Sequence, residues 1–312
     1  MTNVSKSLRG KLAENWLIRP PEIHTVKTSR DGTIKFLLRL EDDSLIESVL
    51  IPEQEKMTQC LSSQVGCPMA CTFCSTGQMG FVRNMRAGEI AGQVLTAREY
   101  LKKHHPEKRL TNFVFMGMGD PLLNWEEMEK ALNILHHPDG LAISKRRITV
   151  SSVGFPGMIA RLGESDLALL AVSLHAPTQE LRKELMPNAA NFKLGDLLAE
   201  LEDFPLRPRE RITIEYLLIK DKNDSPHMAR QLAGLLSGLK CKVNLIAYNP
   251  AGDKDIYRRP GEEQVLTFEK ILWSKGLTAT LRKSKGLDIN AACGQLKVET
   301  TNPNTGEDKI AT

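Results

Sequence analysis

Short runs of apolar and β-branched residues, broken by polar turn residues, mark the beginning of the chain. Such runs predict strands, and the polar residues between them predict turns. The expected strands are residues 23–27, 33–40 and 45–51, with turns at 30–32 and 41–44. A helix is expected before them, from Val4 to Leu17, because Pro20 and Pro21 cannot continue it. The chain is therefore predicted to open with a helix and a small antiparallel sheet, together residues 1–56.

After this sheet the pattern changes to a regular alternation of predicted strands and helices. The strands are 58–61, 112–117, 147–152, 167–175, 212–219, 242–248 and 278–281, and the helices are 126–136, 156–162, 179–185, 194–202, 226–237 and 262–274. The run Leu167–His175 is almost wholly apolar, as expected for a strand covered on both faces. Repeated strand–helix units predict an α/β fold with a parallel sheet, either a doubly wound layer or a barrel. We assign residues 57–290 to this part and residues 291–312 to a C-terminal segment.

Polar residues and glycines follow several of the predicted strands at the point where each strand ends. These residues are Gly117–Pro121, Ser151 and Ser152, Ser173–His175, and Asn249. Because the C-terminal ends of parallel strands meet on one face of a barrel, we expect these residues to share a site. This placement favours a barrel-like enzyme over a binding module.

The composition agrees with a globular protein and excludes several classes. Of the 312 residues, 41% are hydrophobic and 26% are charged, and no apolar run is long enough to span a membrane. Residues 1–20 lack the apolar centre of a secretory signal, and the six cysteines have no disulfide-scaffold spacing. We therefore expect a cytoplasmic protein without membrane contact. A net charge of +4 permits a polyanionic partner but does not require one.

Four of the six cysteines fall within residues 58–77, and three of them have the spacing C-x3-C-x2-C, at Cys67, Cys71 and Cys74. Three thiolates on one loop suit three corners of a cubane iron–sulfur cluster, which leaves one iron open for a further ligand. Zinc is the first alternative; it usually takes four ligands, and the fourth would have to be Cys60, Cys241 or Cys293. Three unligated thiols are the second alternative.

Each of the other motifs also has a purely structural interpretation. Asp120 can cap the segment that follows it, Ser173–His175 can be polar groups of the core, and Asn249 can belong to a turn. A lone cysteine such as Cys293 is more often inert than reactive. The basic runs 145–147 and 207–211 are typical of solvated surfaces and become relevant if the substrate is a nucleic acid.

Four motifs, taken together, resemble those of one protein family. They are Cys60-Leu-Ser-Ser-Gln-Val-Gly-Cys67, Gly117-Met-Gly-Asp-Pro-Leu-Leu-Asn124, Ser173-Leu-His-Ala-Pro177 and Ala292-Cys-Gly-Gln295. Their order and spacing resemble the RlmN/Cfr family of radical S-adenosylmethionine (SAM) RNA methyltransferases over residues 4–297. Pro121–Asn124 is more similar to the RlmN branch than to the Cfr branch, which favours methylation at adenine C2 over C8.

The resemblance implies a fold and a set of cofactor sites. The implied fold is a partial (β/α)6 TIM-like radical SAM barrel with a small N-terminal antiparallel sheet. By resemblance, Cys67, Cys71 and Cys74 hold a [4Fe-4S] cluster, and SAM chelates the open iron. The residues that resemble the SAM site of the family are Asp120, Pro121, Ser151, Ser173, Leu174, His175 and Asn249.

The resemblance also implies a reaction that uses two SAM molecules per turnover. One SAM methylates Cys293, and the second is cleaved to a deoxyadenosyl radical that takes hydrogen from the new S-methyl group. The carbon radical adds to the adenine, so that the RNA becomes joined to Cys293. Glu47 is implied as the proton acceptor, and attack by Cys60 releases the product with a Cys60–Cys293 disulfide.

The implied substrate is an adenosine of 23S rRNA at the peptidyl-transferase centre, with tRNA beside the anticodon as a second substrate. An electron donor such as flavodoxin or ferredoxin and a monomeric enzyme are expected. One alternative is the same chemistry at adenine C8 or on another RNA. A different class, an RNA-binding module without turnover, is disfavoured because binding alone needs no Cys60/Cys293 pair.

Two features depart from the pattern of the family. Asp120 stands where members usually carry Glu, so we expect its carboxylate to reach SAM through a closer backbone or through a water. The stretch Met1–Lys6 resembles an internal segment of the family. Most of the helical accessory domain that helps to bind RNA is therefore expected to be missing.

Overall fold

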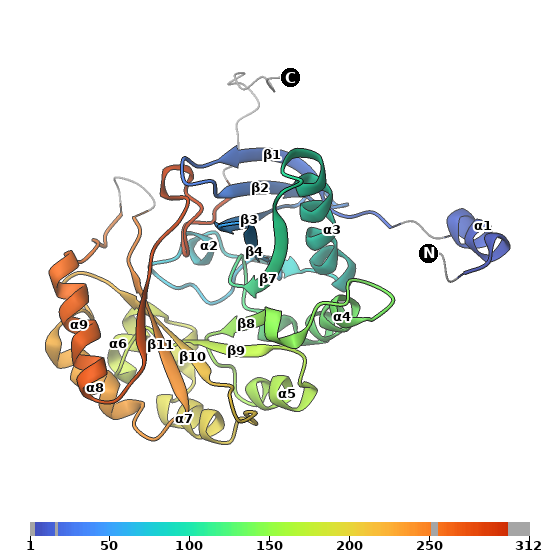
Figure 1. Cartoon of the computed structure of the whole chain (residues 1–312). Helices are drawn as coiled ribbons and strands as arrows, with labels where there is room; N and C mark the ends of the chain where they lie inside the picture. Colours follow the sequence, from blue (N-terminus) through green and yellow to red (C-terminus); the bar gives the residue numbers. More distant parts are fainter. Residues whose placement is uncertain (1–3, 16–17, 251–254, 299–312) are drawn as a thin grey trace.

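One continuous sheet of ten strands runs through the computed structural model, which describes residues 4–15, 18–250 and 255–298. The strand order is β1-β2-β3-β4-β7-β8-β9-β10-β11-β12 (Figure 1). The strands at the β1 end pair antiparallel, and all pairs from β4 to β12 are parallel. The predicted combination of an antiparallel sheet with an α/β barrel is confirmed.

The antiparallel part is followed by a strand that it shares with the barrel. Its strands are β1 (Glu22–Thr28), β2 (Ile34–Arg39) and β3 (Leu45–Glu53), and the shared strand is β4 (Lys56–Cys60). β4 pairs antiparallel with β3 and parallel with β7 (Arg109–Phe115). The expected boundary between residues 56 and 57 falls at the start of β4. The first helix, α1 (Lys6–Asn15), has no buried residue, and residues 16–17 of the expected helix lie outside the described residues.

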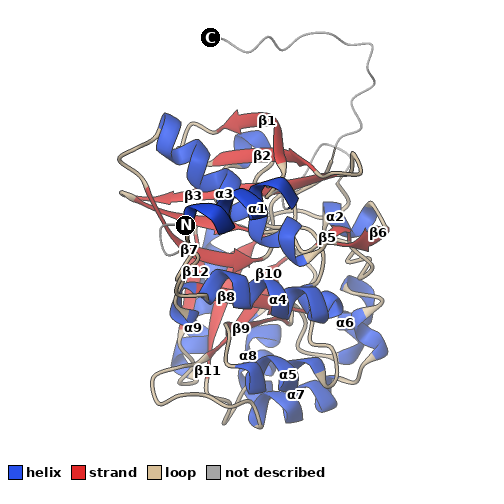
Figure 2. Cartoon of the chain, turned by 90° about the vertical axis from the view of Figure 1, so that its right-hand side faces the viewer, coloured by secondary structure: helices blue, strands red, loops and turns tan. Residues whose placement is uncertain are grey.

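The parallel part alternates strands with helices that cover its outer face. The further strands are β8 (Ile148–Ser152), β9 (Leu169–Ser173), β10 (Ile212–Leu218), β11 (Cys241–Ala247) and β12 (Ala279–Arg282). The helices are α4 (Trp125–His136), α5 (Met158–Ser165), α6 (Gln179–Leu185), α7 (Leu194–Glu202), α8 (Pro226–Leu235) and α9 (Glu262–Ser274). In Figure 2, α4, α5 and α7 lie in front of the strands, on the outside of the curved sheet. In the described part of the chain the sheet ends at β1 and β12, so the barrel is partial, as predicted.

Residues 62–111 have no predicted strand or helix, whereas the structure has several there. The largest is α3 (Ala87–His104), an 18-residue helix. Its buried apolar residues Ile90, Val94, Ala97 and Leu101 have a helical spacing that would have predicted it. The others are α2 (Ser75–Gln78) and the two-stranded sheet of β5 (Gln64–Gly66) and β6 (Phe81–Asn84).

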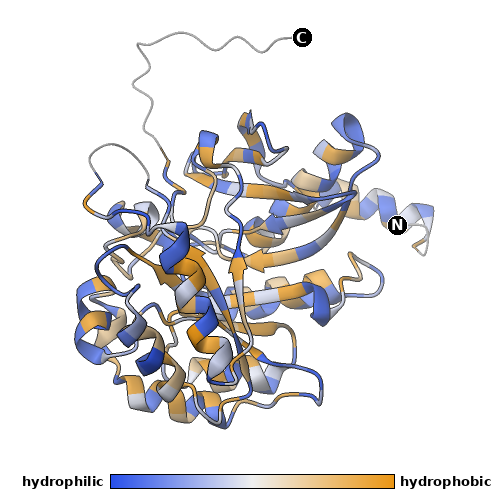
Figure 3. Cartoon of the chain, turned by 60° about the vertical axis from the view of Figure 1, so that its left-hand side comes forward, coloured by the Kyte–Doolittle hydropathy of each residue, from blue (hydrophilic) through white to orange (hydrophobic). Residues whose placement is uncertain are grey.

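The core lies between the sheet and its helices, and the strands are largely hydrophobic in Figure 3. Tyr216 of β10 and Phe268 of α9 show how the two layers meet. Their rings stack with centroids 5.3 Å apart, and both side chains are at most 1% exposed. The Tyr216 hydroxyl donates to the carbonyl of Asn223 at 3.0 Å, so its buried polar atom is satisfied.

Removing the aromatic ring of Phe268 is expected to destabilise the fold. The Phe268→Ala variant should lose about 3–5 kcal/mol of unfolding free energy, because the cavity beside Tyr216 cannot collapse fully. The matched control is Leu266→Ala on the same helix, where the side chain is 41% exposed and a change within about 1 kcal/mol is expected. Urea unfolding followed by circular dichroism measures both, and equal losses would contradict the packing described.

Candidate active site

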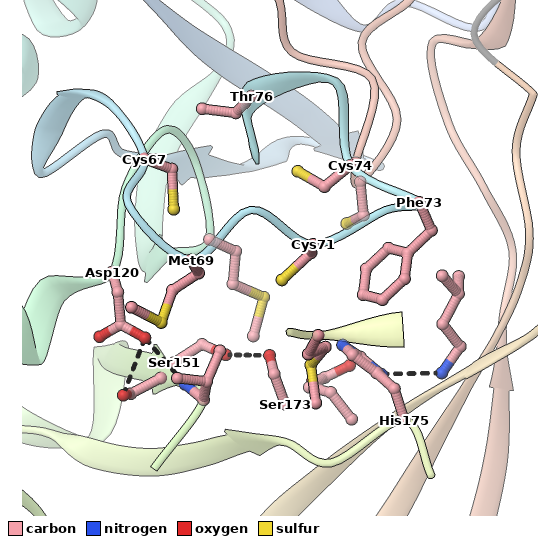
Figure 4. A pocket seen from close by; sticks show the side chains of 18 of the residues that line it. Cys67, Met69, Cys71, Phe73, Cys74, Thr76, Asp120, Ser151, Ser173 and His175 are labelled. Atoms are coloured by element: carbon pink, nitrogen blue, oxygen red, sulfur yellow. Dashed lines mark hydrogen bonds between the residues drawn. The ribbon is translucent and has the colours of Figure 1, made fainter. Parts of the chain in front are cut away.

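A cavity lies between the cysteine loop and the C-terminal ends of the strands, and Figure 4 shows it from close by. The predicted site residues that line this first cavity are Cys67, Cys71, Cys74, Asp120, Ser151, Ser173, His175 and Cys293. They come from the cysteine loop, from the ends of β7, β8 and β9, and from the C-terminal segment. The expectation that the strand ends share one site is therefore met by the geometry.

The cysteine loop is held by backbone hydrogen bonds to the turn before β6 and to the end of α6. The Cys67 N–H donates to the Gly80 carbonyl at 2.8 Å, and the Thr72 N–H donates to the Leu185 carbonyl of α6 at 3.0 Å. Burial raises the pKa of Cys67 to about 12, and it also raises the pKa of Cys71 and of Cys74. Neighbouring thiols contribute to these raised pKa values, because each thiolate would repel the next. Such thiols need a positively charged ligand to deprotonate.

The three thiols are spread around the cavity rather than gathered at one point. In Figure 4, Cys67, Cys71 and Cys74 stand at separate places along the loop. Within the described ranges, no three His, Cys, Asp or Glu side chains are grouped closely enough for a single metal ion. A cubane cluster takes one thiolate at each of several corners, so its ligands need not converge on one point.

Asp120 caps the segment that follows it and also lines the first cavity. Its carboxylate caps the short 3-10 turn Pro121–Asn124 by accepting from the Leu122 N–H at 3.0 Å. It also accepts from the Val153 N–H at 2.8 Å and from the Ser152 hydroxyl at 3.0 Å. Burial raises its pKa, and these hydrogen bonds oppose that effect. The carboxylate lines the cavity but is already bound by three donors of the protein.

At positions 117 and 119 the packing of the protein leaves no room for a side chain larger than that of glycine. A Cβ on Gly117 would lie 2.6 Å from the Leu61 carbonyl oxygen, and one on Gly119 would lie 2.4 Å from the Gln64 side chain. Gly119 also has a φ of +93°, which favours glycine. These contacts bring the Asp120 turn close to β4 and β5, whatever ligand the cavity takes.

His175 is a neutral imidazole with a defined tautomer. Burial, together with a smaller effect from the charge of the nearby Arg182, lowers its pKa to about 3. Its Nδ1 accepts from the Leu217 N–H at 3.0 Å, so the proton of the neutral ring sits on Nε2. The residue has a φ of +56°, and its ring packs edge-on against Phe73 of the cysteine loop, with centroids 5.0 Å apart. His175 therefore offers the cavity a hydrogen-bond donor and no charge.

The remaining predicted SAM-site residues divide into three groups. The hydroxyls of Ser151 and Ser173 line the cavity 3.4 Å apart. Pro121 and Leu174 are buried beside the cavity but are not among the residues that line it. Asn249 lines a second cavity, where its Oδ1 accepts from Arg259 at 2.7 Å; its buried Nδ2 has no partner among the described residues.

This second cavity adjoins the first, and Cys293 lines both. Cys60, at the end of β4, lines the second cavity, together with Arg282 at the end of β12 and Lys285 of the segment that follows. Burial raises the pKa of the Cys60 thiol to about 12, whereas the charge of Arg282 lowers it. Two thiols that are far apart in the sequence thus meet at one cavity.

Glu47 lies outside the residues that line either cavity and holds the C-terminal segment instead. Its carboxylate pairs with Lys35 at 2.8 Å and accepts from the Lys297 N–H at 2.8 Å. Lys35 in turn donates to the Asn290 carbonyl at 3.1 Å. Burial raises the pKa of Glu47, and Lys35 opposes this shift.

Glu215 is a functional candidate that the sequence analysis missed. It is 4% exposed on β10 and lines the first cavity, and one of its oxygens accepts from Asn244 at 2.7 Å. Burial raises its pKa, and Arg282 opposes this shift. A charged residue inside an otherwise apolar strand (Ile212–Leu218) was the signal that could have found it.

The two basic runs lie at the opposite ends of the strands from the cavities. Lys145 precedes β8 and forms ion pairs with Asp166 and Glu210, and Arg207 also pairs with Asp166. Their charges are therefore partly used within the protein. The expectation of a solvated surface suits Arg207, whose side chain is 54% exposed, but not Lys145, whose side chain is 12% exposed.

Comparison with known proteins finds extensive similarity. Residues 61–232 match the family model described as the Radical SAM superfamily. The chain is 57% identical over 304 residues to the "Dual-specificity RNA methyltransferase RlmN" of Oleidesulfovibrio alaskensis, which covers 96% of this chain and 85% of that protein. The protein of the same name from Nitratidesulfovibrio vulgaris strain Miyazaki F is 57% identical over 303 residues, covering 95% and 82%. The crystal structure of a radical SAM methyltransferase from Sphaerobacter thermophilus superposes with a TM-score of 0.89 at 42% identity, covering 96% of this chain and 87% of that one.

The buried neutral state of His175 is expected to make stability depend on pH. The pKa is about 3 in the folded protein and near 6.5 in the unfolded chain. The unfolded chain therefore binds the proton more readily between these values, and acidification below pH 6.5 destabilises the fold. The His175→Asn variant keeps an acceptor for Leu217 and tolerates a positive φ, but does not titrate.

The measurement is the unfolding free energy of wild type and variant between pH 7 and pH 4.5. The difference between the two proteins should change in favour of the variant by up to about 1.4 kcal/mol per pH unit below pH 6.5. The exposed His227, replaced by Asn, is the control and should leave the pH profile unchanged. A difference that is the same at every pH would show that His175 is not buried in the neutral form.

Proposed function

The chain belongs to the radical SAM superfamily and, within it, to the RlmN family of RNA methyltransferases, and from this premise we propose that it methylates carbon 2 of an adenosine in 23S rRNA at the peptidyl-transferase centre. A tRNA adenosine next to the anticodon is the second proposed substrate. The observation that carries the proposal is the position of Cys293. It lines the cavity of the three loop cysteines and also the cavity that contains Cys60.

The residues of the first cavity suit the cofactors of the superfamily. Cys67, Cys71 and Cys74 would hold a [4Fe-4S] cluster, and Asp120 and His175 lie across the cavity where a bound SAM would be held. When bound, the cluster and SAM would supply methyl transfer and one-electron radical chemistry. Asp120 would accept a hydrogen bond from an ammonium group, and His175 would donate one from Nε2.

In this proposal Cys293 forms the covalent link to the RNA, and Cys60 breaks it. Cys293 carries the methyl carbon on its Sγ and becomes linked through that carbon to the adenine. The Cys60 thiolate then attacks Sγ of Cys293, and the bond between sulfur and the carrier carbon breaks. The carbon keeps the electron pair and takes a proton to become the methyl group, while a Cys60–Cys293 disulfide forms. A dithiol reductant must supply two electrons to restore both thiols.

Glu47 is proposed as the acceptor of the adenine C2 proton. Its carboxylate is occupied by Lys35 and by the Lys297 N–H. This role therefore requires the C-terminal segment to release Glu47 when RNA binds. The raised pKa of the buried carboxyl group suits a proton acceptor.

Other features of the proposal follow from the same family. An electron donor of the flavodoxin or ferredoxin class would reduce the cluster, and the enzyme would act as a monomer in the cytoplasm. None of the described helices is both long and apolar enough to cross a membrane. Methylation at adenine C8 is the second candidate, and the RlmN-like segment Pro121–Asn124 supports C2 instead.

Anaerobic reconstitution is expected to give about four irons per chain and broad visible absorbance. Cys71→Ser should lose most of the bound iron, because one corner of the cluster would have no thiolate. Cys241→Ser is the matched control, since this buried thiol starts β11 at the far end of the barrel and should leave the iron content unchanged. Stoichiometric zinc in the wild-type protein would instead contradict the cluster.

Nucleoside mass spectrometry of rRNA and tRNA tests the reaction itself. Cells without the gene should lack 2-methyladenosine, and wild-type protein should restore it. Cys293→Ala should restore none, because no sulfur would carry the methyl carbon. Cys60→Ala should accumulate protein crosslinked to RNA, whereas Cys241→Ala should behave as wild type. Unchanged 2-methyladenosine without the gene would refute the C2 assignment, and appearance of 8-methyladenosine would favour the C8 alternative.

A further inference from the structure

Arg182 is a fully buried cation in the layer directly behind the first cavity. It lies on α6 and is 1% exposed. Its guanidinium donates to three backbone carbonyls at the ends of β8 and β9: Val153 at 2.5 Å, Leu174 at 3.2 Å and Ser173 at 3.5 Å. Its Nε has no hydrogen-bond partner among the described residues.

Within the described ranges, the ion pairs include none between Arg182 and a carboxylate. Burying an unpaired charge is strongly unfavourable, and carbonyl dipoles offset that cost in part. Burial accordingly lowers the pKa of Arg182 to about 10, and the Cys71 thiol opposes this shift. The charge of Arg182 therefore acts on a cysteine of the loop.

The structure connects Arg182 to the loop by short paths. Leu185, one helical turn after Arg182 on α6, accepts from both the N–H and the hydroxyl of Thr72, which follows Cys71. On the other side, Val153 accepts from Arg182 through its backbone oxygen and donates to Asp120 through its backbone nitrogen. The Val153 backbone thus lies between a buried cation and a buried carboxylate, and both charges act on Cys71.

We propose that Arg182 is the fixed counter-charge of the iron–sulfur cluster and raises its reduction potential. Thiolate ligands bring negative charge into the buried site, and reduction adds one more electron. A cation that is held in place and stays charged at neutral pH stabilises the reduced cluster more than the oxidised one. Arg182 is thus a positioning and charge-balancing residue that does not itself touch substrate. This inference rests on the proposed function, because it requires a cluster at Cys67, Cys71 and Cys74.

A purely structural role is the competing explanation. The carbonyls that Arg182 binds belong to the strand ends that carry Ser173 and Val153, so its loss could also displace the walls of the cavity. A lysine at position 182 would keep the charge but cannot bind three carbonyls with a planar fork. Charge and carbonyl binding can therefore be separated by substitution.

The test is a mediated redox titration of the reconstituted full-length protein, followed by electron paramagnetic resonance of the reduced cluster. In Arg182→Met and Arg182→Gln, the ratio of reduced to oxidised cluster at a fixed potential should fall about tenfold, or about 59 mV for a one-electron couple. Arg182→Lys should stay close to wild type. Lys183→Met removes an exposed charge from the same helix and should not shift the titration, because solvent screens it.

The possible outcomes are distinguishable. A full iron content with an unshifted titration in the neutral variants would overturn the counter-charge and leave the proposed function intact. Failure of the wild-type protein to bind about four irons would instead refute the cluster. If neither neutral variant folds, the Arg182→Lys variant distinguishes the effect of the charge from that of the carbonyl contacts. A wild-type titration there supports the charge, and a lowered potential despite the retained charge assigns the effect to the lost carbonyl contacts.

Discussion

The hydrogen bond from the Ser75 N–H to the Gly294 carbonyl, 2.8 Å long, is the contact on which the arrangement of the site depends. It joins the cysteine loop to the C-terminal segment, two parts of the chain that are far apart in sequence. The Thr76 hydroxyl, which donates to the Leu296 carbonyl at 2.6 Å, reinforces it. With these two contacts in place, Cys293 stands at the boundary of both cavities.

The antiparallel sheet also holds the C-terminal segment in place. Ser29 donates to Asp288 at 2.5 Å, Asp31 accepts from the Gly286 N–H at 2.9 Å, and Glu47 accepts from Lys297. These bonds fasten the segment between β12 and Lys297 across the strand ends. The sheet shares β4 with the barrel, so the support and the supported site belong to one continuous structure.

Local pattern was sufficient to predict most of the fold, because the strands and helices of the barrel have strong periodicity. Helices 179–185, 194–202 and 262–274 were predicted with the bounds that the structure has. The arrangement of the site was harder to predict from the sequence. That Cys60 and Cys293 share a cavity depends on long-range hydrogen bonds, which leave no mark on local pattern, and it was expected only from the family resemblance. Glu215 and Arg182 were missed for a related reason: a buried charge has meaning only once its neighbours are known.

The burial of Cys60 has a consequence for the timing of events. Burial raises the pKa of Cys60 to about 12, so the thiol and not the thiolate is the main form at neutral pH. The protonated form is a poor nucleophile and resists oxidation. Cys60 and Cys293 can therefore share a cavity without closing into a disulfide before any RNA has arrived. Burial of Cys60 therefore protects the pair from premature oxidation. The surroundings of its sulfur must change before the thiolate can form and attack Cys293.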